Sequence, residues 1–147
     1  MSGLAGEDNT GRNDDGAIVE EGELGAFRIR LGDCVNGLGF SAETYEVESV
    51  TGVPCSEPHE AEVYLAFNMD GGSTYPGEQA VFADGDERCY NAFEPFVGRD
   101  YATSALDFTY LYPTKESWEQ IDDREILCMI VSVDNSLITG SSRGTGL

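Results

Sequence analysis

The stretch REILCMIVSV, residues 124–133, carries the strongest fold signal in the chain. Its centre, from Ile126 to Val131, is apolar without a break. An uninterrupted apolar run in a strand indicates that both faces of that strand are buried. We therefore expect this segment to be a central strand of a sheet, with Cys128 near its middle.

Working outward, residues 60–68 alternate in the manner of a half-buried strand, with Ala61, Val63, Leu65 and Phe67 expected on one face. Further strands are predicted at residues 27–35, 45–53 and 105–112. A hairpin turn at residues 134–136 is expected to bring residues 137–139 back beside the central strand.

Two helices are predicted between these strands. Pro76 and Glu78 suit the start of a helix over residues 77–97, and Gly98 suits its end, although the DGD sequence at residues 84–86 could split it in two. Residues 113 and 114 open a second, short helix that carries Trp118. The expected fold is α+β, with a small, mostly antiparallel sheet packed against one or two helices.

Residues 1–25 are rich in glycine and acidic residues, and Arg12 is their only basic residue. They contain no aromatic side chain, so their apolar surface is too small to offset the entropy lost on ordering. We interpret them as a flexible acidic linker. Residues 26–147 then form one domain.

The chain carries 28 Asp and Glu against 8 Lys and Arg, a formal net charge of −20. A field of this sign repels phosphate backbones, which argues against a nucleic-acid partner. No apolar run approaches the ~20 residues that cross a bilayer, and residues 1–25 lack the basic and apolar regions of a signal peptide. Membrane contact is therefore expected only through an anchor or export signal upstream of residue 1.

The four cysteines, Cys34, Cys55, Cys89 and Cys128, allow three disulfide pairings. Cys34 and Cys55 lie at the ends of neighbouring predicted strands, whereas Cys89 falls on the inner face of the long helix and Cys128 in the central strand. We favour Cys34 with Cys55 and Cys89 with Cys128, because each pair joins elements that should touch. Each bond would stabilise the domain by ~3–4 kcal/mol through loop entropy.

Disulfides persist outside the cytoplasm, so these cysteines predict an extracytoplasmic protein. A zinc site is disfavoured because the cysteines form no CxxC pair and His59 is the only histidine. We expect neither a metal nor a cofactor.

Several short motifs together resemble the actinobacterial septum-formation domain family, the family of septum formation-related proteins. The most specific is VPCSEPHEAEV at residues 53–63, and the others are LGDC at 31–34, YPGE at 75–78, PTKESW at 113–118, DREILC at 123–128 and LITGSSRG at 137–144. The resemblance runs from about residue 27 to the end. It implies an extracytoplasmic domain tethered to the membrane behind an acidic or proline-rich linker, with a link to cell division and no defining enzymatic activity.

His59 follows Cys55 by four residues, so a thiol enzyme that uses this pair has to be considered, as does a cell-wall hydrolase with a carboxylate pair. A Cys55 bonded to Cys34 would have no free thiolate. We therefore prefer a structural role for His59, in which its imidazole bonds to nearby backbone.

Carboxylates flank His59, and Glu57, Glu60 and Glu62 could hold calcium with it. A solvated acidic face is the interpretation we prefer. Aromatic side chains offer rigid contact area for a partner, and the candidates are Tyr75, Tyr101, Tyr110, Tyr112 and Trp118. The alternative for Trp118 is that it packs the short helix onto the sheet.

The sequence thus predicts a non-enzymatic interaction module of the cell envelope, whose partner is an unidentified envelope protein or cell-wall component. The residues proposed for binding are Glu57, His59, Glu60 and Trp118. The alternatives are a hydrolase or thiol enzyme and a calcium-dependent binding domain.

Overall fold

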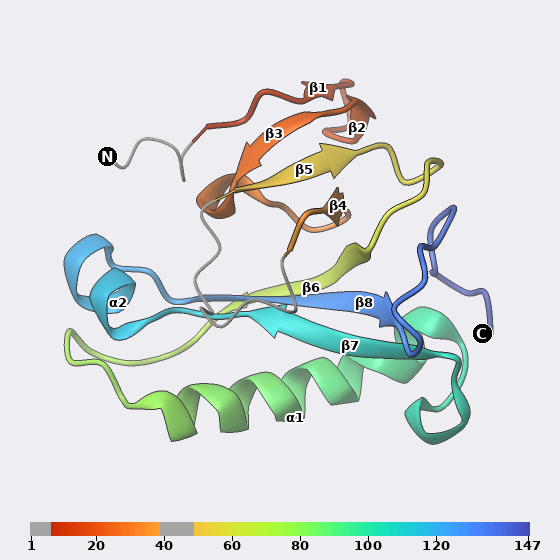
Figure 1. The fold of residues 1–147 in the computed structure, drawn as a ribbon. Helices are drawn as coiled ribbons and strands as arrows, with labels where there is room; N and C mark the ends of the chain where they lie inside the picture. Colours follow the sequence, from red (N-terminus) through yellow and green to blue (C-terminus); the bar gives the residue numbers. More distant parts are fainter. Residues whose placement is uncertain (1–6, 39–48) are drawn as a thin grey trace.

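The computed structural model describes residues 7–38 and 49–147. Its main sheet has six strands in the order β3-β5-β4-β6-β8-β7 (Figure 1). These strands are β3 (Gly22–Gly25), β4 (Cys34–Asn36), β5 (Ser49–Val53), β6 (Ala61–Asn68), β7 (Leu106–Leu111) and β8 (Glu125–Ser132). All neighbouring pairs are antiparallel.

Two more strands, β1 (Gly11–Arg12) and β2 (Ile18–Glu20), form a separate antiparallel pair. The helices are α1 (Glu78–Val97) and α2 (Lys115–Ile121), with short 3-10 turns at Ala26–Arg28 and Tyr101–Thr103. The expected α+β fold with an antiparallel sheet is confirmed. Within the described residues, neither helix has the length and apolar character needed to cross a membrane.

The prediction of a central, doubly covered strand at β8 is confirmed. α1 runs along one side of β6, β8 and β7, and β3, β5 and β4 lie on the other side (Figure 1). The side chains of β8 alternate between two hydrophobic clusters. Ile126, Cys128 and Ile130 join the cluster under α1, whereas Leu127 and Met129 join the cluster on the opposite side.

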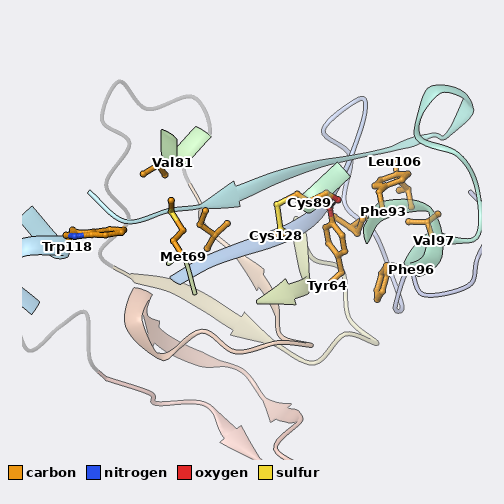
Figure 2. Close-up of a cluster of buried hydrophobic side chains, with 12 residues drawn as sticks. Tyr64, Met69, Val81, Cys89, Phe93, Phe96, Val97, Leu106, Trp118 and Cys128 are labelled. Atoms are coloured by element: carbon orange, nitrogen blue, oxygen red, sulfur yellow. Dashed lines mark hydrogen bonds between the residues drawn. A yellow bond between two sulfur atoms is a disulfide. The ribbon is translucent and has the colours of Figure 1, made fainter. Parts of the chain in front are cut away.

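The cluster under α1 is stapled by the Cys89–Cys128 disulfide, which links the inner face of the helix to the centre of β8 (Figure 2). Beside it, the Tyr64 hydroxyl donates a 2.5 Å hydrogen bond to the carbonyl of Cys89. Burial raises the pKa of Tyr64 above its usual value, so this hydroxyl remains a donor. The phenol thus ties β6 to the same point of the helix.

The alternation expected for residues 60–68 is wrong beyond Val63. The register against β8 shifts between Val63 and Leu65, which leaves Tyr64 as the extra residue of a bulge. Val63 therefore faces the cluster on the far side of the sheet, whereas Tyr64 and Leu65 both face the cluster under α1. Because side chains alternate along a strand, one inserted residue moves every later side chain of β6 to the opposite face of the sheet.

The interpretation of residues 1–25 as a flexible linker is wrong for residues 7–25, whereas residues 1–6 lie outside the described part. β3 pairs with β5, and the side chains of Leu24 and Ile18 are buried. Gly52 in β5 permits this contact, because a Cβ there would meet Ile18 Cδ1 at 2.9 Å. A few well-placed apolar side chains are sufficient to order a segment of unpromising composition.

Arg12 also anchors this segment. Its guanidinium makes a bidentate ion pair with the buried Asp33, with N–O distances of 2.8 and 2.9 Å. These hydrogen bonds raise the pKa of Arg12 further, and a second pair with Asp8 contributes less. The only basic residue of the supposed linker is thus used to neutralise a buried carboxylate.

Three further expectations need correction or fall partly outside the structure. Residues 27–35 are not one strand, because Ala26–Arg28 form a 3-10 turn and only Cys34–Asn36 pair in the sheet. Residues 137–139 do not return beside β8, since Ile138 pairs with His59 instead. Of the strand expected at residues 45–53, the structure describes Ser49–Val53, and residues 45–48 lie outside it.

α1 is continuous through the DGD sequence, and Gly98 ends it in the left-handed conformation, with φ 88°. Gly85 is required by close packing, because a Cβ there would lie 2.6 Å from Tyr110 Cε2. The Tyr110 ring is held in place by hydrogen bonds from its hydroxyl to Asp86 and to the carbonyl of Phe82. The glycine that seemed able to break the helix instead lets β7 approach it.

Replacing this glycine tests the close approach. Gly85→Ala would gain about 1 kcal/mol of helix propensity, but overpacking against Tyr110 costs about 1–3 kcal/mol. We expect a net loss of up to about 2 kcal/mol in the free energy of unfolding, measured by urea denaturation. Gly72→Ala is the control, because a Cβ there meets nothing within 4 Å. A more stable Gly85→Ala variant would contradict the packing described here.

The role of Arg12 is tested by Arg12→Met, which keeps most of the side-chain volume and leaves Asp33 without its guanidinium partner. Breaking a buried pair costs up to about 5 kcal/mol, and the partial exposure of Arg12 reduces this to about 2–3 kcal/mol. Hydrogen exchange should accelerate in residues 7–25 first. The exposed Lys115→Met serves as the control, and equal protection of residues 7–25 in both variants would refute the anchoring role.

Candidate functional site

Both expected disulfides are present. Cys34 on β4 bonds to Cys55, which follows β5, and Cys89 bonds to Cys128. None of the four cysteines is free. The Cys55–His59 nucleophile pair is therefore not available in this structure, because the Cys55 sulfur is bonded to Cys34.

His59 is fully buried between β6 and the C-terminal segment. Its backbone exchanges hydrogen bonds with Ile138, at 2.8 and 2.9 Å. Its Nδ1 lies 2.8 Å from the carbonyl oxygen of Glu57, and because a carbonyl only accepts, Nδ1 carries the proton. The expected bond from the imidazole to nearby backbone is confirmed. The other ring nitrogen, Nε2, is buried and has no hydrogen-bond partner.

Glu62 is buried rather than solvated, which corrects the expectation of an acidic face. Its Oε1 accepts a hydrogen bond from the Ser142 amide at 2.8 Å, and its Oε2 accepts one from the Ser141 hydroxyl at 2.6 Å. Both serines belong to the C-terminal segment. The β6 carboxylate thus fastens this segment to the edge of the core.

These groups form a compact polar cluster. An imidazole nitrogen of His59, a carboxylate oxygen of Glu62 and Cys34 Sγ all lie within 4.8 Å of one another. We call His59, Glu62, Ser142 and Cys34 the His59 cluster. While Cys34 is in its disulfide, the cluster has two groups that can bind a metal, the His59 imidazole and the Glu62 carboxylate. A zinc site uses three or four protein ligands.

The other carboxylates near His59 do not join this cluster. Glu57 points to solvent, and Oε1 of Glu60 accepts hydrogen bonds from the amides of Gly37 and Leu38. Within the described residues, Cys34, His59 and Glu62 are the one group of three or more acidic, histidine or cysteine side chains close enough to share a cation. The structure therefore does not bring Glu57, Glu60 and Glu62 together into the calcium site considered from the sequence.

Trp118 is 1% exposed and joins the hydrophobic cluster under α1 with residues of β8, so the interpretation that it packs the short helix onto the sheet is confirmed. Its Nε1–H donates to the carbonyl of Gly72, and the guanidinium of Arg124 lies 3.8 Å from its ring centroid. It is therefore not an exposed contact residue. The four candidate tyrosines are partly buried against the cluster under α1 as well, namely Tyr75, Tyr101, Tyr110 and Tyr112.

An open pocket of about 510 Å³ lies at the C-terminal end of α1, lined by Tyr90, Asn91, Glu94, Pro95, Gly98 and Tyr101. Tyr90 is 53% exposed and meets the Tyr101 ring edge-on, with centroids 5.5 Å apart. We call this surface the Tyr90 pocket. The sequence interpretation missed Tyr90, although helical spacing could have found it: Cys89 faces the core, so its neighbour turns away from it.

The chemistry of the Tyr90 pocket is that of hydrogen-bond acceptors beside aromatic rings. Pro95 has no N–H, so the carbonyl of Asn91 lacks the hydrogen bond that position 95 of a helix would normally donate. Glu94 also lines the pocket. The Tyr101 hydroxyl donates to Asp107 at 2.7 Å, and this hydrogen bond, with burial second, raises the pKa of Tyr101. Such a surface is suited to a cation.

The sequence pattern of the septum formation family matches residues 31–145, most of the chain. The chain belongs to this family. The resemblance inferred from the short motifs is therefore confirmed.

Two curated relatives of this septum formation domain, from Mycobacterium tuberculosis and Mycobacterium bovis, are both named "Putative lipoprotein LppN". Each is 27% identical over 119 residues, which cover 80% of the present chain and 63% of the relative. The match thus spans less than two thirds of the relatives' own length. No solved structure matches the chain.

The fastening of the C-terminal segment can be tested with two conservative substitutions. Glu62 uses both oxygens as acceptors, so Glu62→Gln turns an amide N–H₂ toward one of its two donors and should cost about 1–3 kcal/mol of unfolding free energy. Glu60 accepts both of its hydrogen bonds through one oxygen, which Gln retains. Glu60→Gln should therefore be nearly neutral. Equal losses in the two variants, measured by urea denaturation, would contradict this assignment.

Proposed function

We propose that this septum formation domain is a non-enzymatic, extracytoplasmic interaction module, tethered to the outer face of the cytoplasmic membrane and connected with septum formation. It binds an envelope protein through the Tyr90 pocket. The family description supports the connection with the septum. The two disulfides and the lipoprotein name of the relatives support the location.

The absence of a free thiol supports a binding role over a thiol enzyme. Cys55 is bonded to Cys34, and His59, the only histidine, is fully buried. A general base has to reach a substrate proton directly or through one water molecule. A buried imidazole that bonds backbone fits a structural role better.

The observation that carries the proposal is the Tyr90 pocket itself. Tyr90, which is 53% exposed, lines one open surface together with Asn91 and Glu94. Aromatic faces and acceptor oxygens together bind a lysine or arginine side chain. The net charge of −20 also steers a cationic partner toward the domain. The partner is therefore a protein that presents a basic segment.

The test is site-specific photo-crosslinking in the native cell, with the full-length protein. A photoreactive amino acid replaces Tyr90, which is 53% exposed, or the matched control Val19, which is 52% exposed and lies on β2. We expect a discrete protein adduct from position 90 alone. Adding Glu94→Lys should reduce this adduct about tenfold, because an attraction of about 0.7 kcal/mol becomes a repulsion of similar size. The charge-matched Glu78→Lys, at the far end of α1, should have little effect.

Two outcomes would overturn the proposal. Adducts of equal intensity from positions 90 and 19 would show that the pocket is not a binding surface. A position-90 adduct unaffected by Glu94→Lys would show that the partner is not held by a basic group. A third result, an adduct with cell-wall glycan instead of protein, would contradict the proposal that the partner is a protein.

A further inference from the structure

The two disulfides of this domain lie in different surroundings. Cys89 and Cys128 are both fully buried in the hydrophobic cluster under α1 (Figure 2). Cys34 is fully buried as well, but its partner Cys55 is only partly buried. The Cys55 end of the Cys34–Cys55 bond therefore belongs to a residue that reaches the surface of the domain, whereas both ends of Cys89–Cys128 are enclosed in the core.

The surroundings of Cys34 and Cys55 would also suit two thiols. Cys55 Sγ lies 3.5 Å from the carbonyl oxygen of Gly32. Cys34 Sγ lies within 4.8 Å of an imidazole nitrogen of His59. Because Nδ1–H of His59 is used by Glu57, the nitrogen left to accept a proton is Nε2, which is buried and unpaired. A disulfide carries no S–H, so neither acceptor is used in the oxidised protein.

A buried, unpaired polar atom in a folded protein calls for an explanation. Reduction of Cys34–Cys55 would bring donors close to these acceptors. The Cys55 S–H could donate to the Gly32 carbonyl, and the Cys34 S–H, whose sulfur lies within 4.8 Å of an imidazole nitrogen of His59, could reach Nε2 after a small shift of its side chain. The fixed negative charge of Glu62 beside Cys34 disfavours a bare thiolate there. After the disulfide breaks, the Cys34 sulfur is therefore more stable as a protonated thiol than as a thiolate.

We propose that the Cys34–Cys55 disulfide is a reversible thiol-exchange site, at which a small thiol attacks Sγ of Cys55. The thiol RSH loses its proton, and its sulfur forms a bond to Cys55 while the Cys34–Cys55 bond breaks. A proton is taken up by Cys34, which then donates it to His59 in a hydrogen bond. A second RSH releases RSSR and leaves Cys55 as a thiol. His59 acts here as a positioning residue for the reduced state.

The fold is compatible with this exchange. β4 keeps its backbone pairing with both β5 and β6 when the bond opens. The His59 backbone remains paired with Ile138, and the Cys89–Cys128 bond still joins α1 to β8. Exchange would therefore alter the surface at Cys55 while the core stays intact.

The experiment follows each cysteine of the purified, oxidised protein in glutathione redox buffers. Samples are quenched with an alkylating agent, and mass spectrometry measures the state of every cysteine. We expect Cys34–Cys55 to be reduced at least about tenfold faster than Cys89–Cys128, since rates of exchange depend on access to the attacked sulfur. The glutathione adduct should appear on Cys55 and not on Cys34.

The positioning role is tested by His59→Asn, whose amide can keep the hydrogen bond to Glu57 but lacks a group in place of Nε2. The dithiol form should then be disfavoured about fivefold at equilibrium, the value of one modest hydrogen bond. Ser142→Ala, which removes the other unpaired buried polar atom of the cluster, should leave this equilibrium unchanged. A merely structural His59 would lower the unfolding free energy without changing the equilibrium.

Two results would overturn the proposal: reduction of both disulfides at one rate, together with global unfolding by near-UV circular dichroism, or an adduct on Cys34. If His59→Asn fails to fold, the selectivity between the two disulfides of the unsubstituted protein still decides the question. The assay contains no partner protein, so its outcome is independent of the crosslinking test of the Tyr90 pocket.

Discussion

The structure depends on the antiparallel pairing of β6 with β8. This pair is buried on both faces, with α1 on one side and the strands β3, β5 and β4 on the other. The bulge at Tyr64 shifts its register by one residue and turns the phenol toward α1. The same pair carries Cys128, through which the helix is held. β4 and β7 pair with this ladder directly, β5 and β3 extend the sheet from β4, and α1 packs against it.

A second constraint is the large negative charge. With a net charge of −20, the domain can bury a carboxylate only where donors are provided. Asp33 has Arg12 and the amide of Arg30, and Glu62 has the two serine donors of the C-terminal segment. In both places, the donor comes from a chain end that would otherwise have little reason to be ordered. The buried acids thus fasten the two ends of the chain to the sheet.

The two disulfides show how similar bonds can differ in their surroundings. Cys89–Cys128 is enclosed by apolar side chains and serves the core. Cys34–Cys55 joins the start of β4 to the end of β5, beside a buried imidazole and a buried carboxylate. The motif that signals the family, VPCSEPHEAEV, supplies His59 and Glu62 of the His59 cluster, and also Cys55, the disulfide partner of its Cys34.

The sequence by itself determined the elements with strong local signals and the links between them. The apolar run of β8 predicted a doubly covered strand, Gly98 marked the end of α1, and the placement of the cysteines led to the correct pairing. These features succeed because periodicity, backbone preference and covalent geometry act over short distances.

Only the tertiary structure decided the rest. The burial of Glu62 depends on Ser141 and Ser142, which lie some 80 residues away. The order of residues 7–25 depends on Arg12 meeting Asp33 and on Leu24 packing in the second core. Trp118 is buried because the loop carbonyl of Gly72 and the Arg124 side chain meet it. Such contacts join residues distant in the chain, so composition and periodicity carry no record of them.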